Sequence, residues 1–489
     1  MTLTQKIAKN AMSLTFSLVV RKIVSMFYFG LIARYFSVYE TGFFFLLTVC
    51  SVFLFIILDC GLSNAIVREG AKEKEKINFF LNHLITIKVP IILIAFIVLF
   101  LILEGFRYPP ITRHLAYIFF FATVLESFSR LFYCCFRALN VMRYEGWGVI
   151  LGQFIMLIAG GLSIFVHKSL YFIIGAIAIN HLFNFVYSLI ISIVRFRIIP
   201  SATINKSIIT KFLRIGFPMA MASIFGSVYM FDAFLLYKFV DVKFIGWYSI
   251  PSKVVTSLFF IAIALAAAVF PVMSDFYKNS HADLLKIYAK ITNVLLWISL
   301  PMSVGIFSLA PEIIEQIFGD KYLPSAVPLK IMAFSLIPAF LYCPISSLLN
   351  ASGREITSSV NQFFALFFHV AFCILLIPRY QVVGVAISFL LGNVFVFFLG
   401  VYSSRKIIKG VFTENIEEIG KTVVATLLMG LCVYSLRGYI NVIFSVLVGF
   451  VIYFAISYVI HGVGFNGFKA EMAQRHWLMI RKYVFGLEH

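Results

Sequence analysis

The chain has 489 residues, of which 62% are hydrophobic and only 12% charged, and its formal net charge is +19. About a quarter of the residues of a soluble domain are charged, so these few charges could not cover a surface exposed to water. The composition therefore excludes a soluble domain and predicts a membrane protein built from helices.

About fourteen apolar stretches follow one another, and each is near the roughly 20 residues that a membrane-spanning helix needs. The short basic start of the chain is not followed by a small-residue cleavage site, so the first helix is expected to stay in the protein. The connections are short, and the longest on the side opposite the N-terminus covers residues 312–326. The expected spans are 13–36, 41–61, 82–103, 114–136, 147–166, 170–194, 212–237, 246–273, 289–311, 327–349, 357–377, 382–403, 421–436 and 440–461.

Lys and Arg are unevenly divided between the two sides of the predicted bundle. If the N-terminus is cytoplasmic, the cytoplasmic segments hold most of them. Because positively charged loops stay in the cytoplasm, both termini are expected there, and this requires an even number of spans. The net charge then follows from topology: no nucleic-acid partner is expected, and the cytoplasmic rim should attract anionic membrane lipids.

The residue types that bind metals show no known ligand spacing. The seven cysteines lie in apolar stretches without a CxxC pair, and the nine histidines form no HExxH cluster. Cysteines in such surroundings behave as small hydrophobic residues. We therefore expect neither a metal site nor another cofactor.

The two halves of the chain resemble each other at a nearly constant offset. Gly and aromatic residues recur at loop edges in any protein with many spans, so each match alone is weak, and the shared offset carries the argument. The matches include Gly42-Phe43 with Gly246-Trp247, 204 positions on, and Gln153, Tyr171, Gly175 and Asn184 with Gln362, Tyr380, Gly384 and Asn393, 209 positions on.

This repeat predicts an all-α polytopic membrane protein with two six-helix lobes and two further helices. Six is an even number, so the two copies run parallel, and repeated lobes that face each other are typical of transport by alternating access. The expected parts are an N-terminal lobe at 1–200, a C-terminal lobe at 201–410, two additional spans at 411–465 and a cytoplasmic tail at 466–489.

Charged residues inside the predicted spans are costly and therefore indicate function. Adjacent residues on a helix point about 100° apart, so at least one of Arg21 and Lys22 should face a cavity. Glu126 and Arg130 are four residues apart and can also simply neutralise each other. The full set is Arg21, Lys22 and Arg34 in the first span, then Asp59, Lys88, Glu126, Arg130, Asp232 and Lys253 in later ones.

Some of these charges have structural alternatives. Asp59 directly precedes Cys60 and Gly61 near a helix end, where it can cap or pair locally. Lys88 and Lys253 are close enough to span ends to extend toward the headgroups. Asp232 lies near the middle of its span and is the best candidate for a carboxylate that responds to protons or ions.

The excess of cations suits a substrate that carries phosphate, because Arg and Lys bind phosphate oxygens strongly where water is scarce. An exporter of cationic drugs would instead need carboxylates. We therefore expect substrate binding by Arg21, Lys22, Lys253, Lys88 and Arg130, and ion coupling or gating by Asp59, Asp232 and Glu126.

Several loop-edge motifs resemble those of the polysaccharide flippases, of the O-antigen repeat-unit type, in the multidrug/oligosaccharidyl-lipid/polysaccharide (MOP) exporter superfamily. The resemblance extends over essentially the whole chain in hydropathy. The motifs are Gly30-Leu31-Ile32-Ala33-Arg34-Tyr35-Phe36, Tyr39-Glu40-Thr41-Gly42-Phe43, Leu58-Asp59-Cys60-Gly61-Leu62-Ser63, Val67-Arg68-Glu69, Gly246-Trp247-Tyr248-Ser249 and Asn350-Ala351-Ser352-Gly353-Arg354.

The resemblance implies a flippase of the bacterial inner membrane. Its substrate would be an undecaprenyl-pyrophosphate-linked oligosaccharide, moved from the cytoplasmic to the periplasmic leaflet with a proton or sodium ion as coupling ion. Arg21, Lys22 and Lys253 are the positions that match the cations of that family's lobes. The resemblance also extends to lipid II flippases, whose two extra helices form a groove for the lipid tail, and it leaves room for polysaccharide-assembly proteins as partners.

Three other classes of protein remain as alternatives. A drug or metabolite antiporter of the multidrug exporter (MATE) type, or a lipid II-type flippase, would share the fold. A membrane-embedded polymerase, ligase or glycosyltransferase would need catalytic residues in sizeable extracytoplasmic loops, and the loops here are too short, so no enzyme is expected. A scaffold without transport would leave the charges inside the membrane unexplained.

Overall fold

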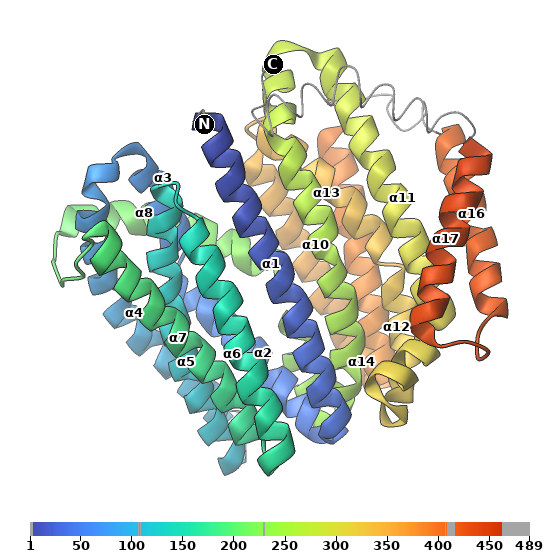
Figure 1. Ribbon diagram of the computed structural model, residues 1–489, viewed down its shortest axis with the longest axis horizontal. Helices are drawn as coiled ribbons and strands as arrows, with labels where there is room; N and C mark the ends of the chain where they lie inside the picture. Colours follow the sequence, from blue (N-terminus) through green and yellow to red (C-terminus); the bar gives the residue numbers. More distant parts are fainter. Residues whose placement is uncertain are drawn as a thin grey trace. The chain divides into compact units, whose positions relative to one another are not determined.

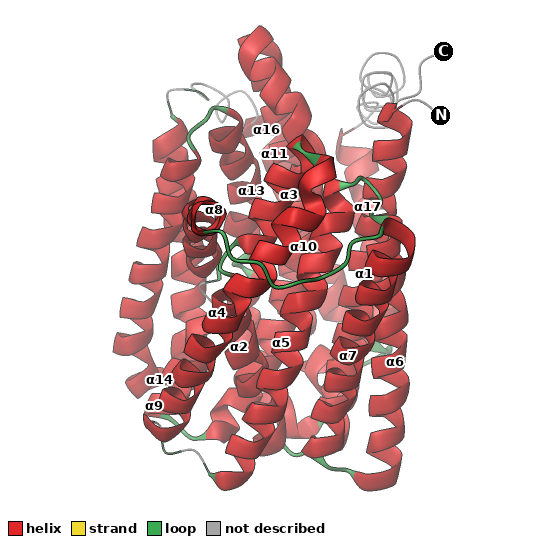
Figure 2. Ribbon diagram, turned by 90° about the vertical axis from the view of Figure 1, so that its left-hand side faces the viewer, coloured by secondary structure: helices red, strands yellow, loops and turns green. Residues whose placement is uncertain are grey.

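A computed structural model describes residues 3–105, 107, 109–227, 230–405, 407 and 416–461. Every regular element in these ranges is a helix (Figure 2). A single chain in lipid favours helices because they satisfy all backbone hydrogen bonds within one segment. The all-α multi-pass fold is therefore as predicted, while the tail expected at 466–489 lies outside the described residues.

The chain divides into two compact units, residues 1–234 and 235–489. Most helices of the first unit are long and apolar enough to cross a membrane (Figure 1). They are α1 (Leu3–Tyr35), α2 (Val38–Asp59), α3 (Leu62–Lys72), the short η1 (Lys74–Lys76), α4 (Ile77–Gly105), α5 (Pro110–Ala138), α6 (Arg143–His167), α7 (Leu170–Phe196) and α8 (Lys206–Gly226).

The boundary between the units falls inside α9 (Met230–Phe239), and the second unit continues from there. Its remaining elements are α10 (Val242–Asn279), α11 (His281–Ile313), the π-helical turn η2 (Ile314–Phe318), the 3₁₀ turn η3 (Asp320–Ser325), α12 (Ala326–Ala333), α13 (Leu336–Ala351), α14 (Glu355–Ser404), α16 (Ile416–Ser435) and α17 (Val442–His461).

Helix α5 is the centre of the first unit and packs against α7, α2 and α3. One buried cluster joins α3, α4, α5 and α8 through Leu62, Leu81, Phe132 and Phe212. As packed, α8 thus belongs with the first unit, although the sequence repeat begins the second lobe at residue 201. The lobe boundary at 200 remains a prediction about the repeat.

Two predicted spans are interrupted in the structure. The stretch 212–237 was expected as one helix, but α8 ends at Gly226, where Ser227 N–H bonds the Ile224 carbonyl. The stretch 327–349 is divided into α12 and α13, which are bent by 40° against each other. Each break is marked by hydrogen bonds to the residue three positions back, which tighten and end a helical turn.

Helix α14 is a hairpin of two arms. Gln381 has φ 51° and ψ −125°, which is not helical. The amide of Asn361 and the hydroxyl of Ser403 exchange hydrogen bonds of 3.1 Å across the arms. A Cβ on Gly384 would come within 2.5 Å of the Leu376 carbonyl oxygen, so the arms touch close to the turn. The two predicted spans at 357–377 and 382–403 are therefore confirmed as separate.

Equivalent helices of the two units begin in the same way. Ser37 caps α2, accepting a hydrogen bond from the Glu40 backbone, and the Glu40 side chain bonds back to Ser37. Asp241, 204 positions on, caps α10 by accepting from Lys243 N–H. Such caps satisfy backbone donors that the first turn leaves open, so the repeated motif marks a repeated helix start.

The structure has 11 helices that could cross a membrane, or up to 12 if the bent pair α12–α13 is one span, among the described residues. That count treats the α14 hairpin as one helix and leaves out the divided α8 and α9. The number fourteen remains a prediction.

Candidate functional site

Helices α1, α5 and α7 bring together a charged cluster inside the first unit. The Glu126 carboxylate on α5 lies 3.7 Å from Nε2 of His181 on α7. The charges of Arg21 on α1 and Arg130 on α5 also act on this carboxylate. We call Arg21, Glu126, Arg130 and His181 the charged cluster.

The geometry of the charged cluster follows from helix packing. Glu126 and Arg130 are one turn apart and share a face of α5, and α5 packs closely on α7. The Arg130 guanidinium lies 5.9 Å from the ring of Phe55 on α2. The protein leaves 29% of the Glu126 side chain uncovered.

The charged cluster has a positive excess. Two guanidinium charges act on one carboxylate, and His181 adds a further charge when it is protonated. The sequence indicated three of these residues but missed His181, because a single histidine carries no motif. Its only signal was that a titratable side chain lies within a predicted span.

Arg21 and Lys22 differ in their surroundings, as expected for neighbours on a helix. Arg21 is half-buried and interacts with Glu126, whereas Lys22 is exposed. Substrate binding by either residue remains a prediction.

Lys88 on α4 is completely buried, and protein groups surround its charge. Its Nζ donates a 3.1 Å hydrogen bond to the Leu58 carbonyl and lies 5.7 Å from the centre of the Phe128 ring. The carboxylate of Asp59 also acts on it. A lysine that bonds the last carbonyls of a helix stabilises that helix end, so in this conformation Lys88 holds the end of α2.

Asp59 belongs to a tight break between α2 and α3. Cys60 and Gly61 both have positive φ, and the Ser63 hydroxyl bonds the Asp59 carboxylate. A Cβ on Gly61 would come within 2.1 Å of the Gly216 carbonyl oxygen on α8. The break therefore provides the surface on which α8 docks, and the local pairing foreseen for Asp59 is present.

The docking of α8 is completed by a buried carboxylate on α3. Glu69 accepts from Lys72 at 2.7 Å and lies 2.6 Å from Lys211 of α8. Hydrogen bonding by Lys211, and then by Lys72, lowers the pKa of Glu69 below its ordinary value. The ion pair thus links α3 and α8 at neutral pH.

A polar network inside the first unit joins α5 and α7. The Tyr133 hydroxyl donates to Asn184 Oδ1 at 2.7 Å, and Asn184 donates in turn to the Asn180 carbonyl at 2.9 Å. All three residues are buried. Such bonds fix helices against each other in lipid, and we assign the network to packing.

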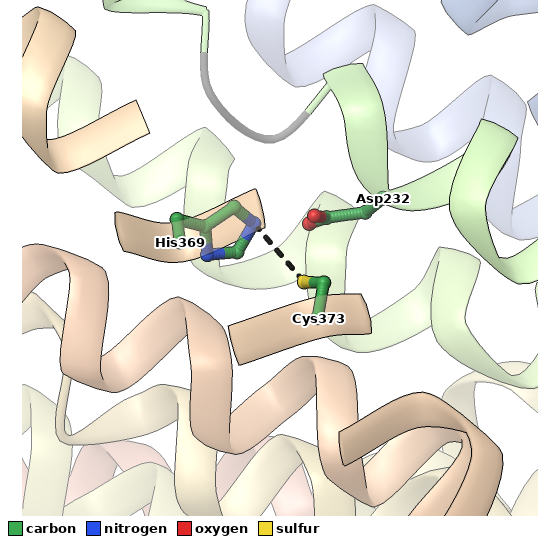
Figure 3. A group of neighbouring side chains, drawn as sticks. All are labelled: Asp232, His369 and Cys373. Carbon is green, nitrogen blue, oxygen red and sulfur yellow. Dashed lines mark hydrogen bonds between the residues drawn. The ribbon is translucent and has the colours of Figure 1, made fainter. Parts of the chain in front are cut away.

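A second group of reactive side chains lies at α14. Cys373 Sγ is 3.5 Å from His369 Nε2, one turn away on the same helix (Figure 3). Asp232 lies on α9, the helix that contains the boundary between the two units. Ligand-type atoms of the three buried residues lie within 4.8 Å of one another.

Aspartate, histidine and cysteine are all metal ligands. This group could not be predicted from the sequence, because Asp232 is far from His369 and Cys373 in the chain. The only local signal was the spacing of four residues between His369 and Cys373. The expectation of no metal remains a prediction. The other predicted cation of the second unit, Lys253 on α10, is partly exposed.

Comparison with known proteins shows the family. The sequence profile described as "Polysaccharide biosynthesis protein" matches residues 7–277, more than half of the chain, and the profile described as "MatE" matches residues 218–375. The chain belongs to the polysaccharide biosynthesis protein family.

Two relatives match in part. An uncharacterized membrane protein of Methanocaldococcus jannaschii is 23% identical over 186 residues, which are 38% of this chain and 37% of the relative. The teichuronic acid biosynthesis protein TuaB of Bacillus subtilis is 27% identical over 126 residues, 25% of this chain and 26% of TuaB. The chain therefore matches well under half the length of each.

Two solved structures share the fold. The lipid II flippase MurJ, in an inward closed conformation, has a TM-score of 0.74 at 18% identity and covers 92% of this chain and 98% of its own. An inward-facing multidrug resistance MATE family transporter has a TM-score of 0.62 at 17% identity, with coverages of 83% and 99%. At these identities the likeness shows the fold alone: the chain has the multi-pass fold that these two proteins share.

Proposed function

We propose that this protein moves an undecaprenyl-pyrophosphate-linked oligosaccharide from the cytoplasmic to the periplasmic leaflet of the bacterial inner membrane. Its membership of the polysaccharide biosynthesis protein family is the observation that carries this proposal. The likeness to part of TuaB, a teichuronic acid biosynthesis protein, agrees with a saccharide cargo.

The pyrophosphate group is the part of the substrate that the charges can recognise. Arg and Lys bind phosphate oxygens through charge-assisted hydrogen bonds, and the charged cluster contains two arginines and one carboxylate. We assign pyrophosphate binding to Arg21, Lys22, Arg130 and Lys253, with Lys88 supporting them from its buried position. The polyprenyl tail stays in lipid, where α16 and α17 offer apolar surfaces, and transport proceeds by alternating access.

Ion coupling belongs to the same proposal. Asp232, Asp59 and Glu126 are the carboxylates that would respond to a proton or a sodium ion. Asp232 has His369 and Cys373 as neighbours, so its charge state affects titratable and metal-binding groups together. Membrane lipids and polysaccharide-assembly proteins are the further partners of the proposed function.

The decisive experiment removes the gene from its host and measures the lipid-linked oligosaccharide in each membrane leaflet. We expect the intermediate to accumulate in the cytoplasmic leaflet with loss of the surface glycan, and its mass would identify the substrate. Normal arrival of the intermediate in the periplasmic leaflet would contradict the proposal.

Complementation of that strain tests the assigned cations. Arg21→Ala, Lys22→Ala and Lys253→Ala should each reduce transport at normal expression, because each removes a phosphate ligand. Arg113→Ala is the matched control, since Arg113 forms a partly exposed ion pair with Glu104. Full transport by all three variants would refute the cationic site.

A second candidate is a drug antiporter of the MATE type, favoured by the MatE match at residues 218–375. It predicts that the gene protects cells against cationic drugs, and that leaflet distribution is unchanged by its deletion. A lipid II-type flippase, favoured by the fold shared with MurJ, predicts complementation of a strain lacking its own lipid II flippase.

A further inference from the structure

Asp232 on α9 and His369 and Cys373 on α14 point toward one another (Figure 3). All three side chains are completely buried, and one ligand-type atom of each lies within 4.8 Å of the others. The proposed function assigns no task to the imidazole or to the thiol. Their place beside a buried carboxylate therefore needs an explanation of its own.

The spacing along α14 and the packing of its two arms fix two of the three side chains. His369 and Cys373 are four residues apart on the first arm, so both leave the same face of the helix. Two histidines at this spacing hold zinc in known helical motifs. The second arm supports the imidazole: a Cβ on Gly392 would come within 3.2 Å of the His369 Cβ, and the Phe389 ring lies edge-on to it at 6.3 Å between centres.

The separations of the ligand atoms suit a tetrahedral ion. Zinc lies about 2.3 Å from a cysteine sulfur and about 2.0–2.1 Å from a histidine nitrogen, which places these two atoms about 3.6 Å apart in a tetrahedral site. Cys373 Sγ lies 3.5 Å from His369 Nε2. A carboxylate oxygen would stand at a similar distance from both, so a shift of about 1 Å by the Asp232 carboxylate closes the site from the limit of 4.8 Å.

The donor atoms and their charges decide the class of ion. Thiolate and imidazole favour zinc and related transition metals, whereas hard cations take oxygen ligands, and only Asp232 offers oxygen in this group. A Zn²⁺ ion held by a carboxylate, a thiolate and a neutral imidazole forms a unit without net charge. Burial in an apolar interior costs far less for such a unit than for a separate charge.

We propose that Asp232, His369 and Cys373 bind one zinc ion, with water or another ligand in the fourth position. Binding releases the thiol proton of Cys373 to solvent. This site goes beyond the proposed function, in which Asp232 responds to a proton or a sodium ion. With zinc bound, Asp232 is a metal ligand that ties α9 to the first arm of α14, and ion coupling passes to Asp59 and Glu126.

The test measures the zinc content of the full-length protein, purified without a histidine tag after expression with zinc in the medium. Because the ligands are completely buried, the ion should enter during folding and remain when a mild chelator is present. We expect about one zinc ion per chain in the wild type. Asp232→Asn, His369→Gln and Cys373→Ser should each lower the retained zinc at least about tenfold, since even outer-shell partners of a metal contribute that much to affinity.

Cys50→Ser is the matched control. Cys50 is also a free, buried cysteine, but it lies on α2, so its loss should leave the zinc content unchanged. Expression with cobalt in place of zinc adds a spectroscopic readout, because a thiol that binds a metal is deprotonated and thiolate-bound Co²⁺ has a charge-transfer band. This band should be present in the wild type and in Cys50→Ser, and absent from Cys373→Ser.

Two results would overturn the zinc site. One is a wild type that retains no zinc and shows no cobalt–thiolate band; the other is retention of one zinc ion by all three ligand variants, since the ion would then lie elsewhere. Should the ligand variants fail to fold, the cobalt spectrum decides: absence of the band in the wild type contradicts the inference, and a band that persists when the other six cysteines are serine supports it. The leaflet distribution of the oligosaccharide tests the proposed function independently of these results.

Discussion

At the scale of single residues, the buried ammonium group of Lys88 shows how a charge is accommodated in the apolar interior. It donates to the carbonyl of Leu58 at the end of α2 and lies against the Phe128 ring. Position in the sequence suggested a side chain reaching toward phosphate or headgroups. Burial instead gives it a partner inside the protein, since a charge away from water must be paired or hydrogen-bonded.

We therefore expect Lys88→Ala to destabilise the protein. The substitution leaves the Leu58 carbonyl without its donor and opens a cavity, at a cost of about 1 to 3 kcal/mol. Thermal unfolding in detergent measures this loss. Arg113→Ala, at a partly exposed ion pair, should change stability by less than about 1 kcal/mol; an equal effect of the two variants would contradict the structural role of Lys88.

Glu69 gives a second prediction at this scale, in the pH dependence of stability. Its pKa is lowered in the folded protein, chiefly by the hydrogen bond from Lys211. A lowered pKa stabilises the fold above the unfolded value, and this contribution is lost as pH falls through the folded value. The difference in melting temperature between wild type and Glu69→Gln should be full at neutral pH and shrink below the ordinary carboxyl value of 4.5. A difference independent of pH would contradict this.

At the scale of elements, α6 packs through glycines that face bulky side chains. A Cβ at Gly160 would come within 2.2 Å of the ring of Tyr28 on α1, whereas at the neighbouring Gly161 it would meet nothing within 4 Å. The Tyr28 hydroxyl in turn donates to the Ile173 carbonyl of α7 at 3.1 Å. The contact of α1 with α6 and α7 therefore requires glycine at position 160 but not at position 161.

Gly160→Ala should destabilise the first unit by about 1 to 3 kcal/mol, because the buried Tyr28 ring must move. Gly161→Ala, one position on, should be neutral or slightly stabilising, since alanine favours a helix over glycine. Unfolding of the two variants under the same conditions compares them directly. Similar losses of stability in both variants would contradict the role of the Tyr28 contact and would indicate that the glycines contribute helix flexibility instead.

At the scale of the whole molecule, hydropathy alone was enough to predict an all-helical membrane protein, and the loop motifs were enough for the family. The breaks within α8–α9 and α12–α13 escaped prediction because they depend on hydrogen bonds inside an apolar stretch. His181 and the group of Asp232, His369 and Cys373 were not predicted for another reason. Their contacts are between residues on separate helices, and the distance between such residues cannot be inferred from the sequence alone.

The orientation of the chain is testable at the α14 hairpin. Tyr380 is exposed near its turn, and Arg354 is exposed beside its start. With both termini in the cytoplasm, we expect Tyr380→Cys to react with a membrane-impermeant maleimide added outside the inner membrane, and Arg354→Cys only after the cells are opened. These reactions are scored against the parent protein with its own cysteines. The reverse pattern would invert the topology.

The docking of α8 on α3 also bears on how this protein can be divided. The sequence repeat suggests a cut after residue 200, yet such a cut would strip Phe212 from the cluster that contains Leu62 and Leu81. A cut between α8 and α9 would leave that cluster complete. The repeated sequence unit and the compactly packed unit therefore have different boundaries. Two half-genes expressed together should assemble better when they are divided between α8 and α9 than when they are divided after residue 200.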